Sequence, residues 1–317
     1  DWQDWTYQVD WRPARQTHSL PAPTPQMAAP APAAQGEDIL EAMEGLARYY
    51  AQSTSRAAQY PGPVCAPEQA RALLGSRPEL ELLESGGPWL ESIWRGERSA
   101  LSCLVPEGDL RLLHHFYHHS DTCRALNSFL AESVGNWLEG QPCPRILEIG
   151  AGTGATTAAL LERLGDRDFE YVISDVSAAF LRTHQERIHD SRVRFITLDI
   201  ENEPPALQFD LVVAANVVHA TRDLTRTLAH LARLLTPGGG LVLLEGTRRR
   251  LWIDLTFGLT DGWWLAQDRD YPLLSGEQWL ERLAAGGWRA GLVWEPPGQT
   301  LFPQAVVVAQ RPSSRLS

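Results

Sequence analysis

The sequence contains no lysine: all 28 of its basic residues are arginine. A Schiff-base lysine and the lysine of a phosphate-binding P-loop are therefore excluded as catalytic devices. The basic residues are also outnumbered by 39 acidic ones, which gives a formal net charge of −11. Because a nucleic-acid surface needs a basic face, we expect no nucleic-acid partner.

Three further absences narrow the class of protein. No run of 18 apolar residues occurs, so we expect no membrane span. The first ten residues lack the basic region and the apolar stretch of a signal peptide. Cysteine is scarce and no CxxC pair is present, which predicts reduced thiols in a cytoplasmic protein rather than a disulfide framework or a zinc site. The four cysteines are Cys65, Cys103, Cys123 and Cys143.

The 317 residues suffice for one large domain or two small ones. Residues 1–36 combine a strand-like segment, TYQVDWRP, with a Pro/Ala-rich segment typical of extended linkers. Because a lone strand is not stable by itself, we expect this stretch to be a strand and a linker from a neighbouring region of a longer protein. Residues 37–140 carry apolar side chains at helical spacing and predict a helical subdomain.

Residues 141–317 alternate between short apolar segments rich in β-formers and amphipathic helical segments. This alternation predicts a parallel sheet with helices on both faces. The last two segments, AGLVWE and QAVVVAQ, are joined by a Pro/Gly loop and are expected to close one edge of the sheet in antiparallel fashion. The five parallel strands are predicted at RILEIG, EYVISDV, VRFITLDI, FDLVVAAN and GLVLLEG.

A glycine-rich turn follows the first predicted strand, with glycines at positions 150, 152 and 154. Glycines at a strand-to-helix turn let the backbone approach a ligand closely. Glu148 lies on the strand just before this turn, and a carboxylate there suits the cationic amino-acid end of a ligand better than a pyrophosphate. The turn therefore predicts a binding site for a ligand with such an end.

Two further acids end the next two predicted strands. Asp175 ends the second strand, where a carboxylate typically binds ribose hydroxyls, and Asp199 ends the third, placed to accept from an adenine amino group. Both lie at carboxyl ends of parallel strands, where open α/β sheets bind ligands. Each acid alone could equally be a helix cap or a turn residue, but the ordered set favours a nucleoside site.

The motifs LEIGAGTG, SDVS, LDIE, FDLVVAANVVHAT and LLTPGGGLVLLEGT, in this order, resemble class I S-adenosylmethionine-dependent methyltransferases over about residues 112–310. More narrowly, NVVHAT, LLEGT and DLTFGLTDGWW are similar to methyltransferase domains of modular type I polyketide synthases. The resemblance implies a Rossmann-like seven-stranded sheet with helices on both faces. It also implies a helical lid over residues 37–140 and a cofactor-binding core over residues 141–317.

The resemblance assigns the cofactor, S-adenosylmethionine, to the strand ends. It implies that Glu148 and the three glycines, Gly150, Gly152 and Gly154, hold the methionine end and that Asp175 binds the ribose. No metal is expected in the reaction.

The same resemblance assigns the remaining cofactor positions and the catalytic pair. Asp199 and Ile200 would bind the adenine, and Asn216 would face the cofactor. His219 follows the fourth strand, and a histidine titrates near neutral pH, so it is the candidate base. Glu245 ends the fifth strand and could orient the imidazole. In polyketide carbon methyltransferases a His–Glu pair at these positions is the catalytic dyad.

Three aromatic residues are the candidate substrate contacts. Tyr117 matches the tyrosine of a family-like FY motif over the active site, and Trp263 and Trp264 are expected to line the acyl entrance. All three could instead be plain core packing.

The segment HHFYHHS, residues 114–120, offers two i,i+4 histidine pairs, a spacing that can chelate a metal. No carboxylate pattern accompanies these pairs, so we expect a solvated or pocket-rim helix face and no metal site.

The resemblance implies methyl transfer to the α-carbon of a β-ketoacyl chain on acyl carrier protein, with neighbouring synthase domains as further partners. An O-methyltransferase acting on the β-hydroxyl or enol oxygen is the first alternative, and the short helical region of about 100 residues favours it. An inactive structural domain is the second alternative. A nicotinamide oxidoreductase is disfavoured, because a Tyr-x-x-x-Lys motif is impossible without lysine.

Overall fold

The structure is a computed structural model that describes residues 36–311, apart from residues 297 and 299. The strand and linker predicted for residues 1–36 therefore lie, up to residue 35, outside the described residues.

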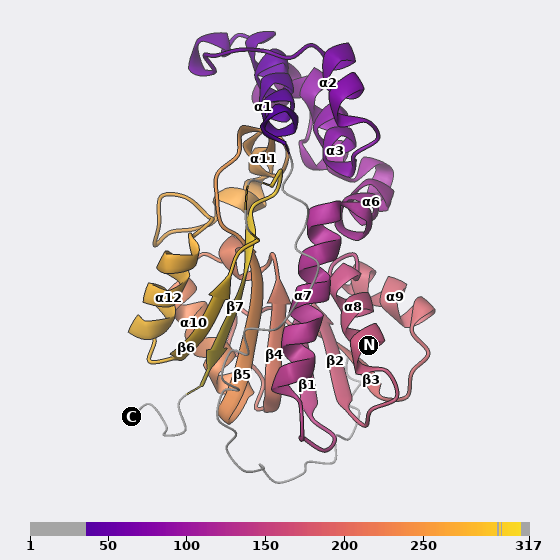
Figure 1. Cartoon of the computed structure of the whole chain (residues 1–317), viewed down its shortest axis with the longest axis vertical. Coiled ribbons are helices and arrows are strands. Elements are labelled where there is room, and N and C mark those ends of the chain that lie inside the picture. The colour runs from indigo at the N-terminus through magenta and orange to yellow at the C-terminus, as the bar shows by residue number, and fades with distance from the viewer. Residues whose placement is uncertain (1–35, 297, 299, 312–317) are drawn as a thin grey trace.

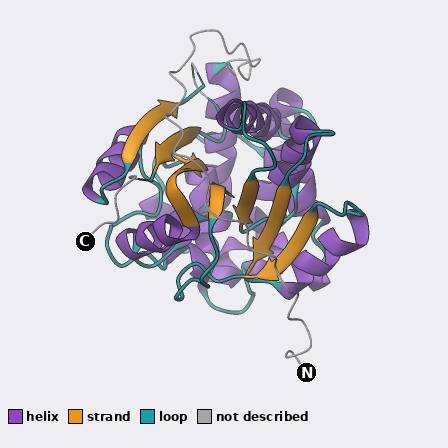
Figure 2. Ribbon diagram, turned by 90° about the horizontal axis from the view of Figure 1, so that it is seen from below, coloured by secondary structure: helices purple, strands orange, loops and turns teal. Residues whose placement is uncertain are grey.

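The core is one seven-stranded sheet in the order β3-β2-β1-β4-β5-β7-β6, with helices on both faces (Figures 1 and 2). Strands β1 to β5 are parallel, and β7 pairs antiparallel with both β5 and β6. The predicted fold class and the antiparallel edge are both confirmed. The strands are β1 (Arg145–Ile149), β2 (Glu170–Asp175), β3 (Val193–Thr197), β4 (Phe209–Ala215), β5 (Leu235–Gly246), β6 (Arg289–Trp294) and β7 (Gln304–Gln310).

The strands are nearly all apolar because both faces of the sheet are covered. Successive side chains of a strand point to opposite faces. Leu147 accordingly packs in the cluster under α10 (Leu224–Leu234) and α12 (Gly276–Ala285). Its neighbour Ile146 packs on the other face, under α7 (Asp121–Trp137), α8 (Ala155–Leu164) and α9 (Ala178–Arg187).

A helical cap stands over the carboxyl ends of the parallel strands (Figure 1). It has its own apolar core, which includes Met43, Leu46 and Phe116 and is joined by Trp252 and Phe302 from the sheet's half of the chain. Its helices are α1 (Glu37–Gln52), α2 (Pro67–Leu74), α3 (Pro78–Gly86), α4 (Leu90–Trp94), α5 (Leu101–Leu104) and α6 (Arg111–His119), with α11 (Leu251–Asp254) packed beneath α1. Short 3-10 turns are formed by Ala57–Gln59, Gly87–Trp89, Pro106–Gly108, Val218–Ala220, Phe257–Leu259 and Asp261–Trp264.

Helix α7 lies within the range predicted for the helical lid, yet it packs on the sheet with Phe129, Leu130 and Val134. The packing thus groups α7 with the core. The division of the chain at residue 140 stays a prediction.

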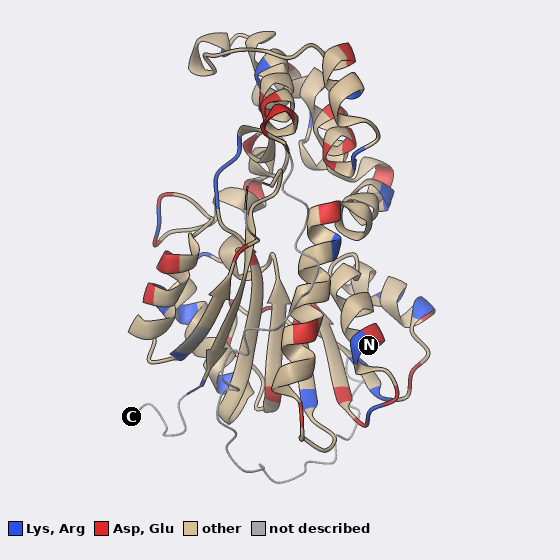
Figure 3. Cartoon of the chain, viewed as in Figure 1, with Lys and Arg blue, Asp and Glu red and all other residues tan. Residues whose placement is uncertain are grey.

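Charged residues of the sheet lie mostly at or near strand ends (Figure 3). Three acids near the carboxyl ends are almost fully buried: Glu148 is 2% exposed, Asp175 5% and Glu245 0%. A buried carboxylate is costly unless it has partners, so these three mark the place where function is to be sought. In the described part of the chain, no helix is long and apolar enough to cross a bilayer.

Candidate active site

The glycine-rich turn forms a cradle at the end of β1. Gly150, Gly152 and Gly154 have φ values of 66°, 52° and 85°, the left-handed region that favours glycine. A Cβ on Gly152 would meet nothing closer than a backbone oxygen at 3.9 Å, so this part of the backbone is open to a ligand. A Cβ on Gly154 would lie 2.5 Å from Cε1 of His184, which leaves no room for a side chain there.

Three side chains hold this cradle in place. Asp175 Oδ2 accepts from the N–H of Gly152 at 2.9 Å, so the carboxylate assigned to the ribose also supports the turn. Nε2 of His184 lies 3.0 Å from the Gly152 carbonyl, and Nε2 of His118 lies 3.1 Å from the Thr153 carbonyl. A carbonyl only accepts, so both imidazoles donate. Since burial lowers the pKa of both histidines, both stay neutral at pH 7.

Replacing Gly154 with alanine is expected to cost about 2–4 kcal/mol of stability, because overpacking adds to the left-handed strain. The new Cβ would push the His184 ring away from the Gly152 carbonyl, so cofactor affinity should fall as well. Thermal unfolding and calorimetric titration with S-adenosylmethionine measure the two effects. Gly165→Ala is the matched control: φ is 53°, but its Cβ would meet nothing closer than 3.9 Å. Equal losses of affinity in both variants would contradict the steric argument.

Glu148 lies beneath the cradle with two protein donors. Its Oε2 accepts from the Tyr171 hydroxyl at 2.5 Å and from the Thr157 hydroxyl at 2.7 Å. Burial raises the pKa of this carboxyl to about 7, against the lowering effect of the two hydroxyls. Its predicted role at the cationic end of the cofactor stays a prediction, and a positive group brought close would lower this pKa.

Glu148→Gln is expected to remove a pH dependence from the stability of the cofactor-free protein. A carboxyl whose pKa is raised on folding stabilises the fold below about pH 4.5, and this stabilisation is lost as the pH rises toward 7. Between pH 5 and pH 8, the free energy of unfolding of the variant should therefore rise by roughly 3 kcal/mol relative to that of the wild type. Denaturant unfolding at both pH values measures it. If the free energies of unfolding of variant and wild type differ by the same amount at pH 5 and at pH 8, the carboxyl does not titrate in this range.

The three other predicted cofactor residues behave differently from one another. Asp199 is exposed, and its carboxylate accepts from the N–H of Glu201 at 2.9 Å and the Asn202 amide at 2.8 Å, as a turn residue does. Ile200 is buried in the core. Asn216 follows β4 in the left-handed region, with φ 54°, and its Oδ1 accepts from Gln304 at 2.9 Å. The adenine roles of Asp199 and Ile200 stay predictions.

The structure brings His219 and Glu245 together. His219 lies in the 3-10 turn after β4 and is 5% exposed, and its Nδ1 is 2.5 Å from Oε2 of Glu245. Oε1 of Glu245 accepts from the N–H groups of Val217 and Val218 at 3.3 and 2.8 Å. The carboxylate is thereby fixed on one side by the backbone. It accepts from Nδ1–H on the other, which leaves Nε2 of His219 without its proton and able to act as a base.

The predicted substrate residues lie on the cap side of this pair. The Trp263 ring is buried, with its centroid 5.4 Å from that of His219 in an edge arrangement. Trp264 is 49% exposed, and its indole N–H donates to the Gly258 carbonyl. Tyr117 is half-buried, and burial raises its pKa, with smaller effects from Cys123 and Glu245. Trp263 and Tyr117 thus lie near the pair, and Trp264 lies at the surface.

Two histidines of α6 bind protein groups. His115 Nδ1 is 2.9 Å from Glu81, and His118 donates to the cradle. Within residues 36–311, without 297 and 299, no group of three or more potential ligands is placed to hold a metal ion.

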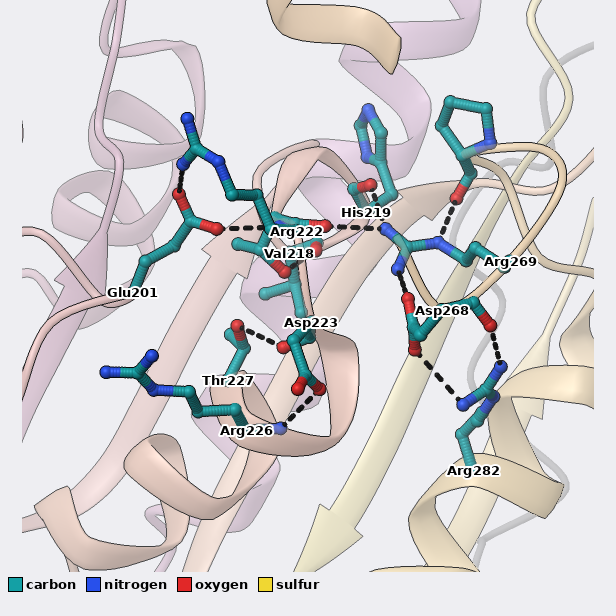
Figure 4. A network of polar contacts seen from close by, with 12 residues as sticks. Glu201, Val218, His219, Arg222, Asp223, Arg226, Thr227, Asp268, Arg269 and Arg282 are labelled. Atoms are coloured by element: carbon teal, nitrogen blue, oxygen red, sulfur yellow. Dashed lines mark hydrogen bonds and ion pairs between the residues drawn. The ribbon is translucent and has the colours of Figure 1, made fainter. Parts of the chain in front are cut away.

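Sequence analysis missed two residues of the site, His184 and Arg269, and it expected His118 only on a solvated or pocket-rim helix face, without its contact to the cradle. Arg269 donates to the carbonyl of His219 at 2.5 Å (Figure 4). Nothing in the sequence separates Arg269 from the other arginines. A signal for His184 does exist, because an imidazole on the buried face of a helix needs a partner.

A family model described as a methyltransferase domain matches residues 147–241. The non-reducing polyketide synthase dpmpA of Macrophomina phaseolina is 39% identical over 231 residues, which cover 67% of this chain and 10% of that protein. The citrinin polyketide synthase CMeT domain has a TM-score of 0.70 at 27% identity, over 80% of this chain and 72% of that one. The crystal structure of the CurJ carbon methyltransferase has a TM-score of 0.72 at 36% identity, with the same shares covered.

The chain belongs to the carbon methyltransferase domains of polyketide synthases. The predicted family and the predicted enzyme class, an S-adenosylmethionine-dependent methyltransferase, are confirmed. This methyltransferase spans between 5% and 10% of the length of the first curated relatives that it matches. Those relatives are large proteins in which the matching part is one segment.

The cofactor of this methyltransferase is S-adenosylmethionine, and the residues at the strand ends fit it. The open face of Gly152 admits a ligand to the backbone, and a buried carboxyl with a pKa of about 7 at Glu148 can become the counter-charge of an ammonium group. Asp175 supplies a second buried carboxylate at the neighbouring strand end.

Proposed function

We propose that this methyltransferase transfers a methyl group to the α-carbon of a β-ketoacyl chain carried by acyl carrier protein. His219 is the base in this proposal, and Glu245 orients it. The observation that carries the proposal is the 2.5 Å contact of these two buried side chains at the carboxyl ends of β4 and β5, on the same edge of the sheet as the glycine cradle. Membership of the carbon methyltransferase family supports carbon as the acceptor.

The geometry suits proton removal from an acidic carbon. The α-hydrogens of a β-ketoacyl chain lie between two carbonyls, so a neutral imidazole is a sufficient base. Nε2 of His219 takes the proton, and the buried carboxylate of Glu245 stabilises the imidazolium that forms. The electron pair left on the α-carbon forms the new carbon–carbon bond, and the proton later passes from Nε2 to solvent. When bound, S-adenosylmethionine supplies an electrophilic methyl group; the bond between this methyl group and the sulfonium sulfur breaks, and the sulfur is left as a neutral thioether.

Partners follow from this substrate. An acyl carrier protein bears the chain, and neighbouring polyketide synthase domains are the covalent context of the curated relatives. The cytoplasmic location remains an expectation from the sequence.

The acceptor atom is tested by mass spectrometry. Carrier protein is loaded with a β-ketoacyl group or, separately, with a β-hydroxyacyl group, and is incubated with S-adenosylmethionine and the protein. Fragmentation of the methylated product locates the methyl group. Methyl on the α-carbon of the ketoacyl chain is expected. Methyl on oxygen would assign the alternative, an O-methyltransferase, because the same base could remove a hydroxyl proton. Cofactor binding without product from either chain would assign a structural domain.

A further inference from the structure

A polar network lies behind His219, on the side away from its ring (Figure 4). At its centre is Arg269, whose side chain is only 5% exposed. The guanidinium donates to the carbonyls of His219 at 2.5 Å, Thr221 at 3.0 Å and Pro272 at 3.3 Å, and pairs with Asp268 at 2.5 Å. One side chain therefore binds the backbone of the base itself.

The network extends to both sides of the turn that carries the base. On one side, the N–H and the guanidinium of Arg222 bind the carboxylate of Glu201 at 2.6 and 2.5 Å. On the other side, Arg282 of α12 binds the carboxylate of Asp268 at 3.1 Å. The N–H of Gln267 donates to the Arg222 carbonyl at 2.8 Å, which closes the contact between the two loops.

The contacts of Arg269 match what a buried cation and a short turn each require. A buried charge is tolerated when it is paired and its donors are satisfied, as they are here. A single 3-10 turn leaves carbonyls without partners inside the turn, and the rigid fork of a guanidinium can bind two of them at once. Glu245 fixes the ring of His219, and Arg269 fixes its backbone.

Arg269 also fixes the segment opposite the base. It lies a few residues after Trp263, whose ring meets that of His219 at 5.4 Å. Because one guanidinium binds both loops, it sets the distance between the base and the aromatic wall beside it. A misplacement of about 1 Å at such a site can cost 10²-fold in rate.

We propose that Arg269 is a positioning residue for the base, holding the His219 backbone and the aromatic segment in register. The proposal rests on the proposed function only in that His219 acts as the base. In this proposal Arg269 acts through the backbone of His219 and not on the reacting atoms.

The test compares Arg269→Ala and Arg269→Lys with Arg282→Ala. Arg282 binds the same Asp268 without contacting the His219 or Thr221 carbonyl, so it is a matched control. For Arg269→Ala, kcat should fall roughly 10- to 100-fold while KM for the acyl thioester and Kd for S-adenosylmethionine change by less than about threefold. Arg269→Lys should recover part of the loss, and Arg282→Ala should keep kcat within about twofold.

A second measurement does not depend on methyl transfer. The hydrogen bond from Nδ1 of His219 to Glu245 should give a downfield proton resonance that His219→Ala abolishes. We expect it to broaden or disappear in Arg269→Ala and to persist in Arg282→Ala. If the wild type methylates no acceptor, the proposed function fails, while this resonance still tests the positioning role.

Three results would overturn the proposal. The first is an unchanged kcat and resonance in Arg269→Ala. The second is an equal loss of kcat in Arg269→Ala and Arg282→Ala, which would indicate general destabilisation. The third is full activity in Arg269→Lys, which would show that the fork is not needed. The lysine variant also serves if Arg269→Ala does not fold, because it keeps the buried charge next to Asp268.

Discussion

His219→Ala is expected to lower kcat for methyl transfer to a β-ketoacyl thioester by roughly 10²–10⁴-fold, the usual contribution of a general base. The affinity for S-adenosylmethionine should stay close to that of the wild type, because the ring of His219 contacts Glu245 and Trp263 rather than the glycine cradle. Single-turnover rates measured by mass spectrometry, together with calorimetric titration of the cofactor, separate the two effects.

His189→Ala provides the control for the loss of a histidine, because His189 is exposed on the surface after α9. Its rate should match that of the wild type. If His219→Ala methylates the α-carbon at the wild-type rate, His219 is not the base. The acidic α-hydrogen would then be lost to solvent without the help of the protein.

Glu245→Gln is the second large effect, with an expected loss of roughly 10²–10⁴-fold in kcat. The carboxylate accepts on both sides, from the N–H of Val218 at 2.8 Å and from His219 at 2.5 Å. An amide has only one oxygen, so one side must face its NH₂ group. If the oxygen stays with the backbone, the NH₂ group faces Nδ1 and favours the tautomer whose Nε2 carries the proton. If the amide is turned the other way, its NH₂ group faces the backbone, and the N–H groups of Val217 and Val218 are left without an acceptor.

The stability of Glu245→Gln should also fall, by about 1–3 kcal/mol, because a buried donor loses its acceptor. Thermal unfolding measures this loss, and the exposed Glu203→Gln gives the reference for a neutral surface change. A Glu245→Gln protein with normal kcat would show that the tautomer of His219 is set by something other than this carboxylate.

The strand ends explain why much of the site could be predicted from sequence. The alternation of apolar segments and amphipathic helices predicts the sheet, and parallel strands bring their carboxyl ends to one edge. His219 follows β4 and Glu245 lies near the end of the neighbouring strand β5, so their contact follows from topology. The apolar spacing of α1 likewise predicts its buried face, which includes Met43 and Leu46.

Contacts of loops and of the cap could not be predicted in this way. Arg269 is 50 residues from His219 and His118 is 35 residues from Thr153, and neither pair is set by strand order. Asp199 shows a different difficulty: a carboxylate after a strand can bind a ligand or a turn, and Asp199 accepts from Glu201 and Asn202, two and three residues further along. Local hydrogen bonds of this kind compete with ligand binding and leave no separate pattern in the sequence.

The contact between Gly150 and Val217 makes the wall between the cofactor cradle and the base a single side chain thick. A Cβ on Gly150 would lie 2.5 Å from Val217, and the N–H of Val217 donates to Glu245. A substitution at Val217 is therefore expected to alter the base and the cradle together, which makes this position unsuitable for changing the acceptor specificity. The segment from Phe257 to Trp264 meets the base from the other side, so a change of acceptor is better sought there.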